Sequence, residues 1–131
     1  MGVVSVIAAG AAAWVFGAIW YSVLAQAWKE ASGVALGEDG APVNQKNPVP
    51  YIASMVCMIV VAGMIRHIFA GTGITTLGAG GLAGLGAGLF IAAPWIVTCY
   101  GFAGRPLKLI LIDGGYATFG CMVIGIVLTL F

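Results

Sequence analysis

Charge is the property that this sequence has least of. Only 7% of its 131 residues are charged, and four acidic and five basic residues give a formal net charge of +1. A soluble domain carries about 25% charged residues on average, which keep its surface wetted. The shortage excludes an ordinary water-soluble domain. The near-neutral balance gives no electrostatic reason to expect nucleic acid or an acidic substrate as a partner.

Residues that usually carry chemistry are scarce as well. The sequence has one histidine, His67, and its three cysteines, at 57, 99 and 121, show neither metal-ligand spacing nor the spacing of a disulfide framework. No glycine-rich loop follows a strand pattern, and no nucleophile is paired with a base. We therefore expect no catalytic residues, no metal and no cofactor, and we expect that the protein is not an enzyme.

Apolar residues dominate instead, at 62% of the chain, with a mean hydropathy of +1.12. Long stretches carry no charge, and a membrane core of about 30 Å needs about 20 apolar residues of helix. The residues from 69 to 73 read as a turn. We therefore predict a single transmembrane domain over 1–131, with four spans at roughly 3–26, 48–66, 74–100 and 107–130.

The apolar stretches are continuous and rich in Ala, Gly, Leu and Ile, whereas strands of a membrane barrel alternate apolar and polar residues. This predicts an all-α membrane protein, a four-transmembrane-helix bundle. Pro48, Pro50 and Pro106 stand where helices can begin. Pro94 lies inside the third helix, where we expect a kink. The residues from Trp28 onward predict a short interfacial segment after the first helix.

Basic residues predict the orientation. Four of the five lie in or beside the loops 27–47 and 101–106, and Arg66 lies alone in the loop between them. Because cytoplasmic loops carry the excess of Lys and Arg, both of these loops are expected in the cytoplasm and both termini outside. The first apolar run lacks a basic start and exceeds the usual length of a signal-peptide core, so we interpret it as a retained span.

Glycine is abundant, with 21 residues, and many lie within predicted helices. Gly80, Gly84 and Gly88 are spaced by four residues and so share one helix face. Small residues at such spacing let helix backbones approach closely in a membrane. Comparable spacings occur at 9, 13 and 17 and at 117, 121 and 125. Packing within the bundle and self-association in a homo-oligomer both fit this pattern.

Asp113 stands out because it lies inside the fourth predicted span, where a carboxylate is costly unless it finds partners. Tyr21 and Ser22 of the first span can donate hydrogen bonds to it, and Arg105 or Lys108 can supply a counter-charge. The acid can act as a functional site or simply tie the first and fourth helices together. We predict an intramembrane polar cluster of residues that lie at one depth: Asp113, Tyr21, Ser22, Tyr116, Trp20, Trp95, Arg105 and Lys108.

Two segments resemble a bacterial family of small four-span membrane proteins, the domain of unknown function 1761 family. One is Gly17-Ala18-Ile19-Trp20-Tyr21-Ser22 with Trp28 after it. The other runs from Gly104-Arg105-Pro106-Leu107-Lys108 to Leu111-Ile112-Asp113-Gly114-Gly115-Tyr116. The four-span layout covers nearly the whole chain. The resemblance implies a multi-pass protein of the bacterial cytoplasmic (inner) membrane, and it implies no activity.

The chain departs from this family's pattern at two positions. Val23 stands where a proline is expected after the Trp-Tyr-Ser run, and Ala117 stands where a histidine is expected after Tyr116. The second departure weakens any proton relay between an aspartate and a histidine.

Two functions from different classes remain. The first is a structural or accessory membrane subunit that self-associates as a homo-oligomer or attaches to a larger membrane complex. The alternative is a small oligomeric transporter or channel that uses the site around Asp113. The lipid bilayer is the expected partner in either case, and no nucleic acid is expected.

Overall fold

The structure is a computed structural model that describes residues 2–131. This part of the chain is helical apart from its connections and one isolated β-bridge between Leu36 and Pro42. The helical elements, in chain order, are α1 (Gly2–Val23), α2 (Ala25–Ser32), α3 (Pro48–Thr72), α4 (Leu77–Ala87), the π-helical turn η1 (Gly88–Ala92), α5 (Ala93–Phe102) and α6 (Leu107–Leu128).

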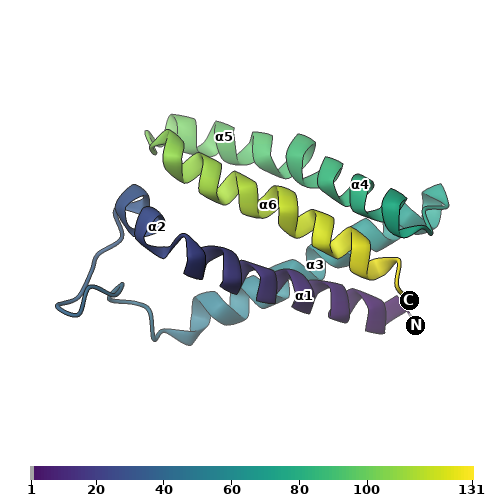
Figure 1. Cartoon of the computed structure of the whole chain (residues 1–131), viewed down its shortest axis with the longest axis horizontal. Helices are drawn as coiled ribbons and strands as arrows, with labels where there is room; N and C mark the ends of the chain where they lie inside the picture. The colour runs from purple at the N-terminus through teal and green to yellow at the C-terminus, as the bar shows by residue number, and fades with distance from the viewer. Residues whose placement is uncertain (1) are drawn as a thin grey trace.

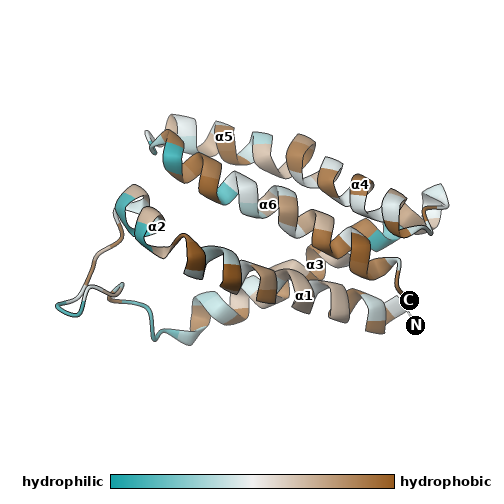
Figure 2. Ribbon diagram, in the orientation of Figure 1, coloured by the Kyte–Doolittle hydropathy of each residue, from teal (hydrophilic) through white to brown (hydrophobic). Residues whose placement is uncertain are grey.

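Four helical stretches are long and apolar enough to cross a membrane: α1, α3, the continuous run Leu77–Phe102 and α6. They all extend along the length of the molecule in Figure 1, with α3 crossing behind α1, and they are apolar along most of their length in Figure 2. The predicted class, an all-α protein with four membrane spans, is confirmed. Hydrophobic residues make up 62% of the chain, and four of its helices can cross a bilayer, so the protein is a membrane protein.

The second span, α3, is longer than the charge pattern predicted. Its expected end at residue 66 was set by Arg66, but α3 continues to Thr72. Arg66 does not end the helix because its Nε donates to Ser5 Oγ of α1, at 3.2 Å. The helix stops instead at Gly73, which adopts a φ of 72° that a side chain rarely tolerates. The third span consequently begins at Leu77, three residues after the predicted start.

The third span is not a uniform α-helix. Residues Gly88–Ala92 form the π-helical turn η1, in which the N–H of Ala93 donates to the carbonyl of Gly88, five residues earlier. Pro94 is the second residue after this turn and has no N–H for an α-helical bond, so the wider turn before it relieves the clash of its ring. The bend predicted at Pro94 stays a prediction, as does the membrane-surface position of α2.

The central helix is α6, which packs against α1, α3, α4 and α5. In residues 2–131 no extensive helix contact joins α3 to the third span, so these two helices flank the bundle. The core lies where α1, α3 and α6 meet (Figure 1). Its buried members are Ala9, Ala13, Ala62, Ile65, Phe69, Cys121, Ile124 and Leu128.

The third and fourth spans approach backbone to backbone. Gly80, Gly84 and Gly88 are all buried and face α6. A Cβ at Gly84 would run into the backbone oxygen of Cys121, and a Cβ at Gly88 would lie 2.5 Å from the oxygen of Ala117. The predicted glycine face thus packs inside the bundle. Two membrane helices can approach this closely only where the residues between them are small.

Candidate functional site

Two tyrosine hydroxyls from different spans converge on Asp113 of α6. Its Oδ1 accepts a hydrogen bond of 2.5 Å from the hydroxyl of Tyr21 on α1, and its Oδ2 accepts one of 2.7 Å from the hydroxyl of Tyr100 on α5. Both carboxyl oxygens are therefore engaged, each by a different span. We call Asp113, Tyr21 and Tyr100 the tyrosine–aspartate clasp.

Aromatic rings surround the clasp on the side of α1. The ring of Tyr21 packs edge-on against Tyr116, with centroids 5.4 Å apart, and against Trp28 of α2, at 6.3 Å. Tyr116 lies on α6, and its hydroxyl donates to the backbone oxygen of Ala13 at 3.1 Å. The ring of Tyr116 fits over Gly17, where a Cβ would lie 2.7 Å from the hydroxyl oxygen. These contacts fix the ring of Tyr21 beside the acid.

Trp20 also holds α1 to α6, although it does not touch the acid. Its Nε1 donates to the backbone oxygen of Ile112 at 3.0 Å, next to Asp113 in the chain. The indole lies over Gly115, where a Cβ would come within 2.7 Å of it. The predicted neighbourhood of Trp20, Tyr21, Tyr116 and Asp113 is thus brought together.

Four residues of the predicted cluster lie elsewhere. Ser22 donates to Ala18 in its own helix, at 2.6 Å, because it lies about 100° around the helix from Tyr21. Trp95 is 68% exposed, since it lies on a different face of α5 from Tyr100. Arg105 donates to the carbonyl of Ser32, and Lys108 pairs with Glu30. No basic side chain in residues 2–131 forms an ion pair with Asp113. The prediction that Arg105 or Lys108 supplies its counter-charge is therefore wrong.

Tyr100 was not predicted as a member of the cluster. It lies near the end of a span, where a belt of aromatic residues at the membrane surface is common, so its position alone did not single it out. One signal was available. The connection from Phe102 to Leu107 is short, so the end of the third span must lie beside the start of the fourth. A tyrosine two residues before such a connection can reach an acid in the next helix.

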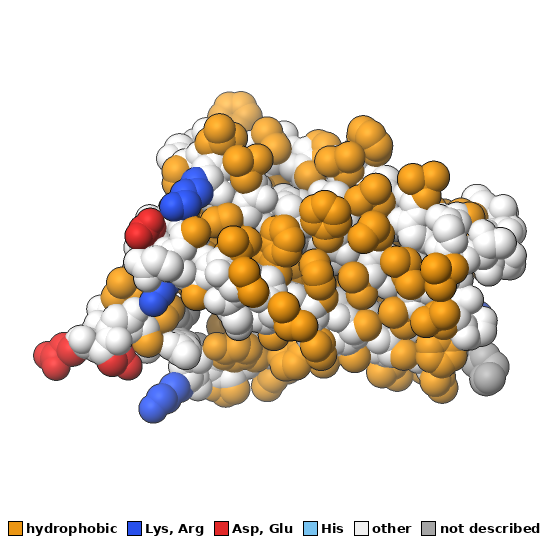
Figure 3. Space-filling model, viewed as in Figure 1, with side chains coloured by type: hydrophobic (Ala, Val, Ile, Leu, Met, Phe, Trp, Pro, Cys, Tyr) orange, Lys and Arg blue, Asp and Glu red, His pale blue; other side chains and the backbone are white. Residues whose placement is uncertain are grey.

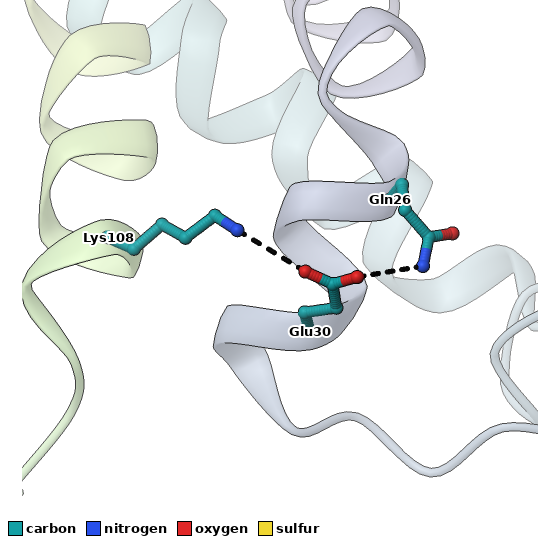
Figure 4. Close-up of polar contacts among 3 residues, drawn as sticks. All are labelled: Gln26, Glu30 and Lys108. Carbon is teal, nitrogen blue, oxygen red and sulfur yellow. Dashed lines mark hydrogen bonds and ion pairs between the residues drawn. The ribbon is translucent and has the colours of Figure 1, made fainter.

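A second, exposed group of polar residues ties α2 to the start of α6 (Figure 4). Glu30 Oε1 accepts from Gln26 Nε2 at 3.1 Å, and Glu30 Oε2 lies 3.3 Å from Lys108 Nζ. The hydrogen bond from Gln26 and then the one from Lys108 lower the pKa of the Glu30 carboxyl below its usual value of 4.5. The partners are 53% and 59% exposed, so water and salt weaken this pair.

The geometry of the clasp is typical of a structural tie. Every buried side-chain nitrogen or oxygen in residues 2–131 has a hydrogen-bond partner. In the same residues, no three His, Cys, Asp or Glu side chains come close enough together to hold a metal ion. The carboxylate can accept hydrogen bonds, and the two hydroxyls donate them. These groups can hold three helices in register.

A family model described as "Protein of unknown function (DUF1761)" matches residues 4–129. The chain belongs to this family. The match covers nearly the whole sequence and confirms the resemblance stated above. Membership in this family agrees with four apolar helices but supplies no activity. No curated protein and no solved structure matches the chain.

Proposed function

We propose that this member of the family is a structural or accessory subunit of a membrane assembly, without catalytic activity. The observation that carries the proposal is the clasp. Both oxygens of the one carboxylate inside the spans are taken up by tyrosine hydroxyls from two other spans. An acid used in this way holds three helices together.

The proposed contact surface is the outer side of the second and third spans. Only 11% of the residues in their most apolar windows are buried, against 28% for the first and fourth spans. The exposed residues on these two spans include bulky ones such as Val56, Val60, Leu82 and Leu89. Large apolar side chains there fit a neighbouring helix of a second copy or of a larger complex. The small-residue faces are used internally and are not part of this surface.

Two native cysteines allow a direct test. Cys57 on α3 and Cys99 on α5 are exposed, whereas Cys121 on α6 is buried. In native membranes, a bifunctional maleimide should link copies or partners through Cys57 or Cys99. The variant Cys57→Ser/Cys99→Ser, which keeps only Cys121, serves as the matched control and should not be linked. A protein that stays unlinked and has the mass of one chain in lipid nanodiscs would contradict the proposal.

The alternative function is an oligomeric transporter or channel that uses Asp113. Asp113 remains half-buried and not fully enclosed, which is the observation in its favour. Flux of protons and small solutes into liposomes distinguishes the two functions. The structural proposal predicts no flux above that of empty liposomes. A flux that Asp113→Asn abolishes would replace the structural proposal with the transport one.

The orientation and location belong to the same proposal. The loops 27–47 and 101–106 would face the cytoplasm and both termini the outside, in the inner membrane of a bacterium. The support is the distribution of basic residues, four of which lie at one end of the molecule.

A further inference from the structure

Arg66 is a cation without an acidic partner, at the end of the bundle opposite the clasp. Its one hydrogen bond to a side chain in residues 2–131 goes to Ser5 Oγ, and no ion pair in this part of the chain includes it. Three of the four acidic residues of the sequence, Glu30, Glu38 and Asp39, lie beyond the far end of α1. That helix has 22 residues and is roughly 33 Å long at 1.5 Å per residue.

The remaining acid, Asp113, is engaged by the two tyrosines of the clasp. Figure 3 shows the same imbalance, since nearly all the charged side chains in view gather at the left end of the molecule. Helix α1 begins at Gly2 against the guanidinium of Arg66 and has no acidic residue in its first turn. The positive end of a helix and an arginine together favour an anion at this place.

Two hollows lie beside the part of α3 that carries Arg66. The first has a volume of about 220 Å³ and is lined by Arg66, Phe69, Ile74 and Thr75 among others. The second has a volume of about 250 Å³ and runs between α3 and the third span. Phe69 lines both, so the hollow at Arg66 and the apolar hollow adjoin at this side chain.

The second hollow is lined only by apolar residues and glycine: Ile65, Ile68, Phe69, Ala83, Gly86, Ala87, Phe90 and Ile91. It exists because α3 and the third span pack on other helices and not on each other. Gly86 leaves it wide, since a Cβ there would meet no atom within 4 Å. An unbranched hydrocarbon chain is the shape that fits such a groove in a membrane.

We propose that this combined hollow binds one anionic phospholipid. The phosphate group lies at Arg66, and one acyl chain lies in the groove between α3 and α4–η1. Charge complementarity selects this occupant: a helix of a second copy would fill the apolar groove but would leave Arg66 without an anion. The inference is independent of the proposed subunit function, because it concerns lipid bound within one chain.

The test uses native mass spectrometry of the purified, delipidated full chain in mild detergent. Phosphatidylglycerol and phosphatidylcholine with identical acyl chains are titrated in turn. For the first lipid that binds, the dissociation constant of phosphatidylglycerol should be about threefold lower than that of phosphatidylcholine. A difference of this size is expected for one partly solvated ion pair. Arg66→Gln should abolish this preference, and Arg66→Lys should retain most of it. Equal binding of the two lipids to the unchanged protein would overturn the proposal.

The acyl-chain part of the site is tested by Gly86→Leu, which fills the groove. The matched control is Gly78→Leu on the same helix, where a Cβ also meets no atom within 4 Å but which lines neither hollow. Gly86→Leu should weaken the first binding event of both lipids at least threefold, and Gly78→Leu should leave it unchanged. If the two variants bind alike, or if Gly86→Leu changes only the oligomeric mass, the groove does not hold a lipid chain. The comparison of Gly86→Leu with Gly78→Leu tests the lipid site even if Arg66→Gln does not fold.

Discussion

At the scale of single residues, Asp113 is the side chain that joins the most spans through hydrogen bonds. Its carboxylate joins α1, α5 and α6 through two short hydrogen bonds with tyrosine hydroxyls. Hydrogen bonds that include a charged group contribute more than neutral ones, about 1.5–3 kcal/mol against about 1 kcal/mol. Within lipid, the helices have no water with which to replace these bonds.

Asp113→Asn should therefore lower the free energy of unfolding by about 1–3 kcal/mol, because the amide keeps one acceptor and turns a donor toward the other tyrosine. The measurement is thermal or denaturant unfolding in mild detergent, with Glu38→Gln in the exposed loop as the control. Tyr21→Phe and Tyr100→Phe should each cost less than Asp113→Asn. If Asp113→Asn unfolds together with the Glu38→Gln control, the clasp does not stabilise the fold.

The contact between Glu30 of α2 and Lys108 of α6 should depend on pH. Its lowered pKa means that the folded state favours the ionised carboxyl, so the stabilisation is complete above pH 4.5 and is lost as the pH falls through the folded-state pKa. Spin labels at Ala31→Cys and Leu107→Cys, in a background without native cysteines, should report a narrow distance distribution at pH 7. The distribution should broaden below pH 4.5, and in Glu30→Gln it should be broad throughout. A distribution that does not change with pH would contradict the role of this pair.

The residues also show what a sequence can and cannot predict. Asp113 was identifiable because a charge inside an apolar run needs a partner, and Tyr21 was identifiable because it lies at the same depth. Tyr100 was missed, and four residues were wrongly included: Ser22, Trp95, Arg105 and Lys108. Depth follows from counting residues along the chain, but the face that each helix turns toward its neighbour depends on packing, which no single-helix pattern contains.

At the scale of helices, glycine decides which spans come closest. The third and fourth spans meet through Gly80, Gly84 and Gly88, where any side chain would enter the backbone of α6 or Thr129 just beyond it. The spacing by four residues predicted a close contact but not its partner. Ends of helices were harder to predict: Arg66 suggested an end, yet a hydrogen bond to Ser5 lets α3 continue for six more residues.

Two alanine substitutions on α4 separate close packing from helix propensity. Gly84→Ala should destabilise the protein by about 1–3 kcal/mol, because its methyl group would overlap the backbone oxygen of Cys121 and force the helices apart. Gly86→Ala should be neutral or stabilising by up to about 1 kcal/mol, because alanine favours helix and meets open space there. Unfolding in mild detergent measures both. Equal stabilities for the two variants would show that the helices are not in close contact at Gly84.

At the scale of the whole molecule, the protein is an open arrangement of four spans. The central helix α6 contacts the other three spans, and nearly all the charged side chains in view gather at one end (Figure 3). The class followed from the 62% of hydrophobic residues, and the number of spans followed from their distribution in four long stretches. The order of the helices around α6 did not follow, since several orders satisfy the same hydropathy.

The clasp, the helix contacts and the lipid groove all require that the chain crosses a lipid bilayer four times. Labelling of single cysteines in sealed membranes tests this most directly. In a background without native cysteines, Glu38→Cys and Ala103→Cys should react with an impermeant maleimide from one side. Thr75→Cys should react only from the other. This pattern follows from four crossings, whichever way the protein faces. Equal labelling of all three positions from a single side of intact membranes would contradict the account.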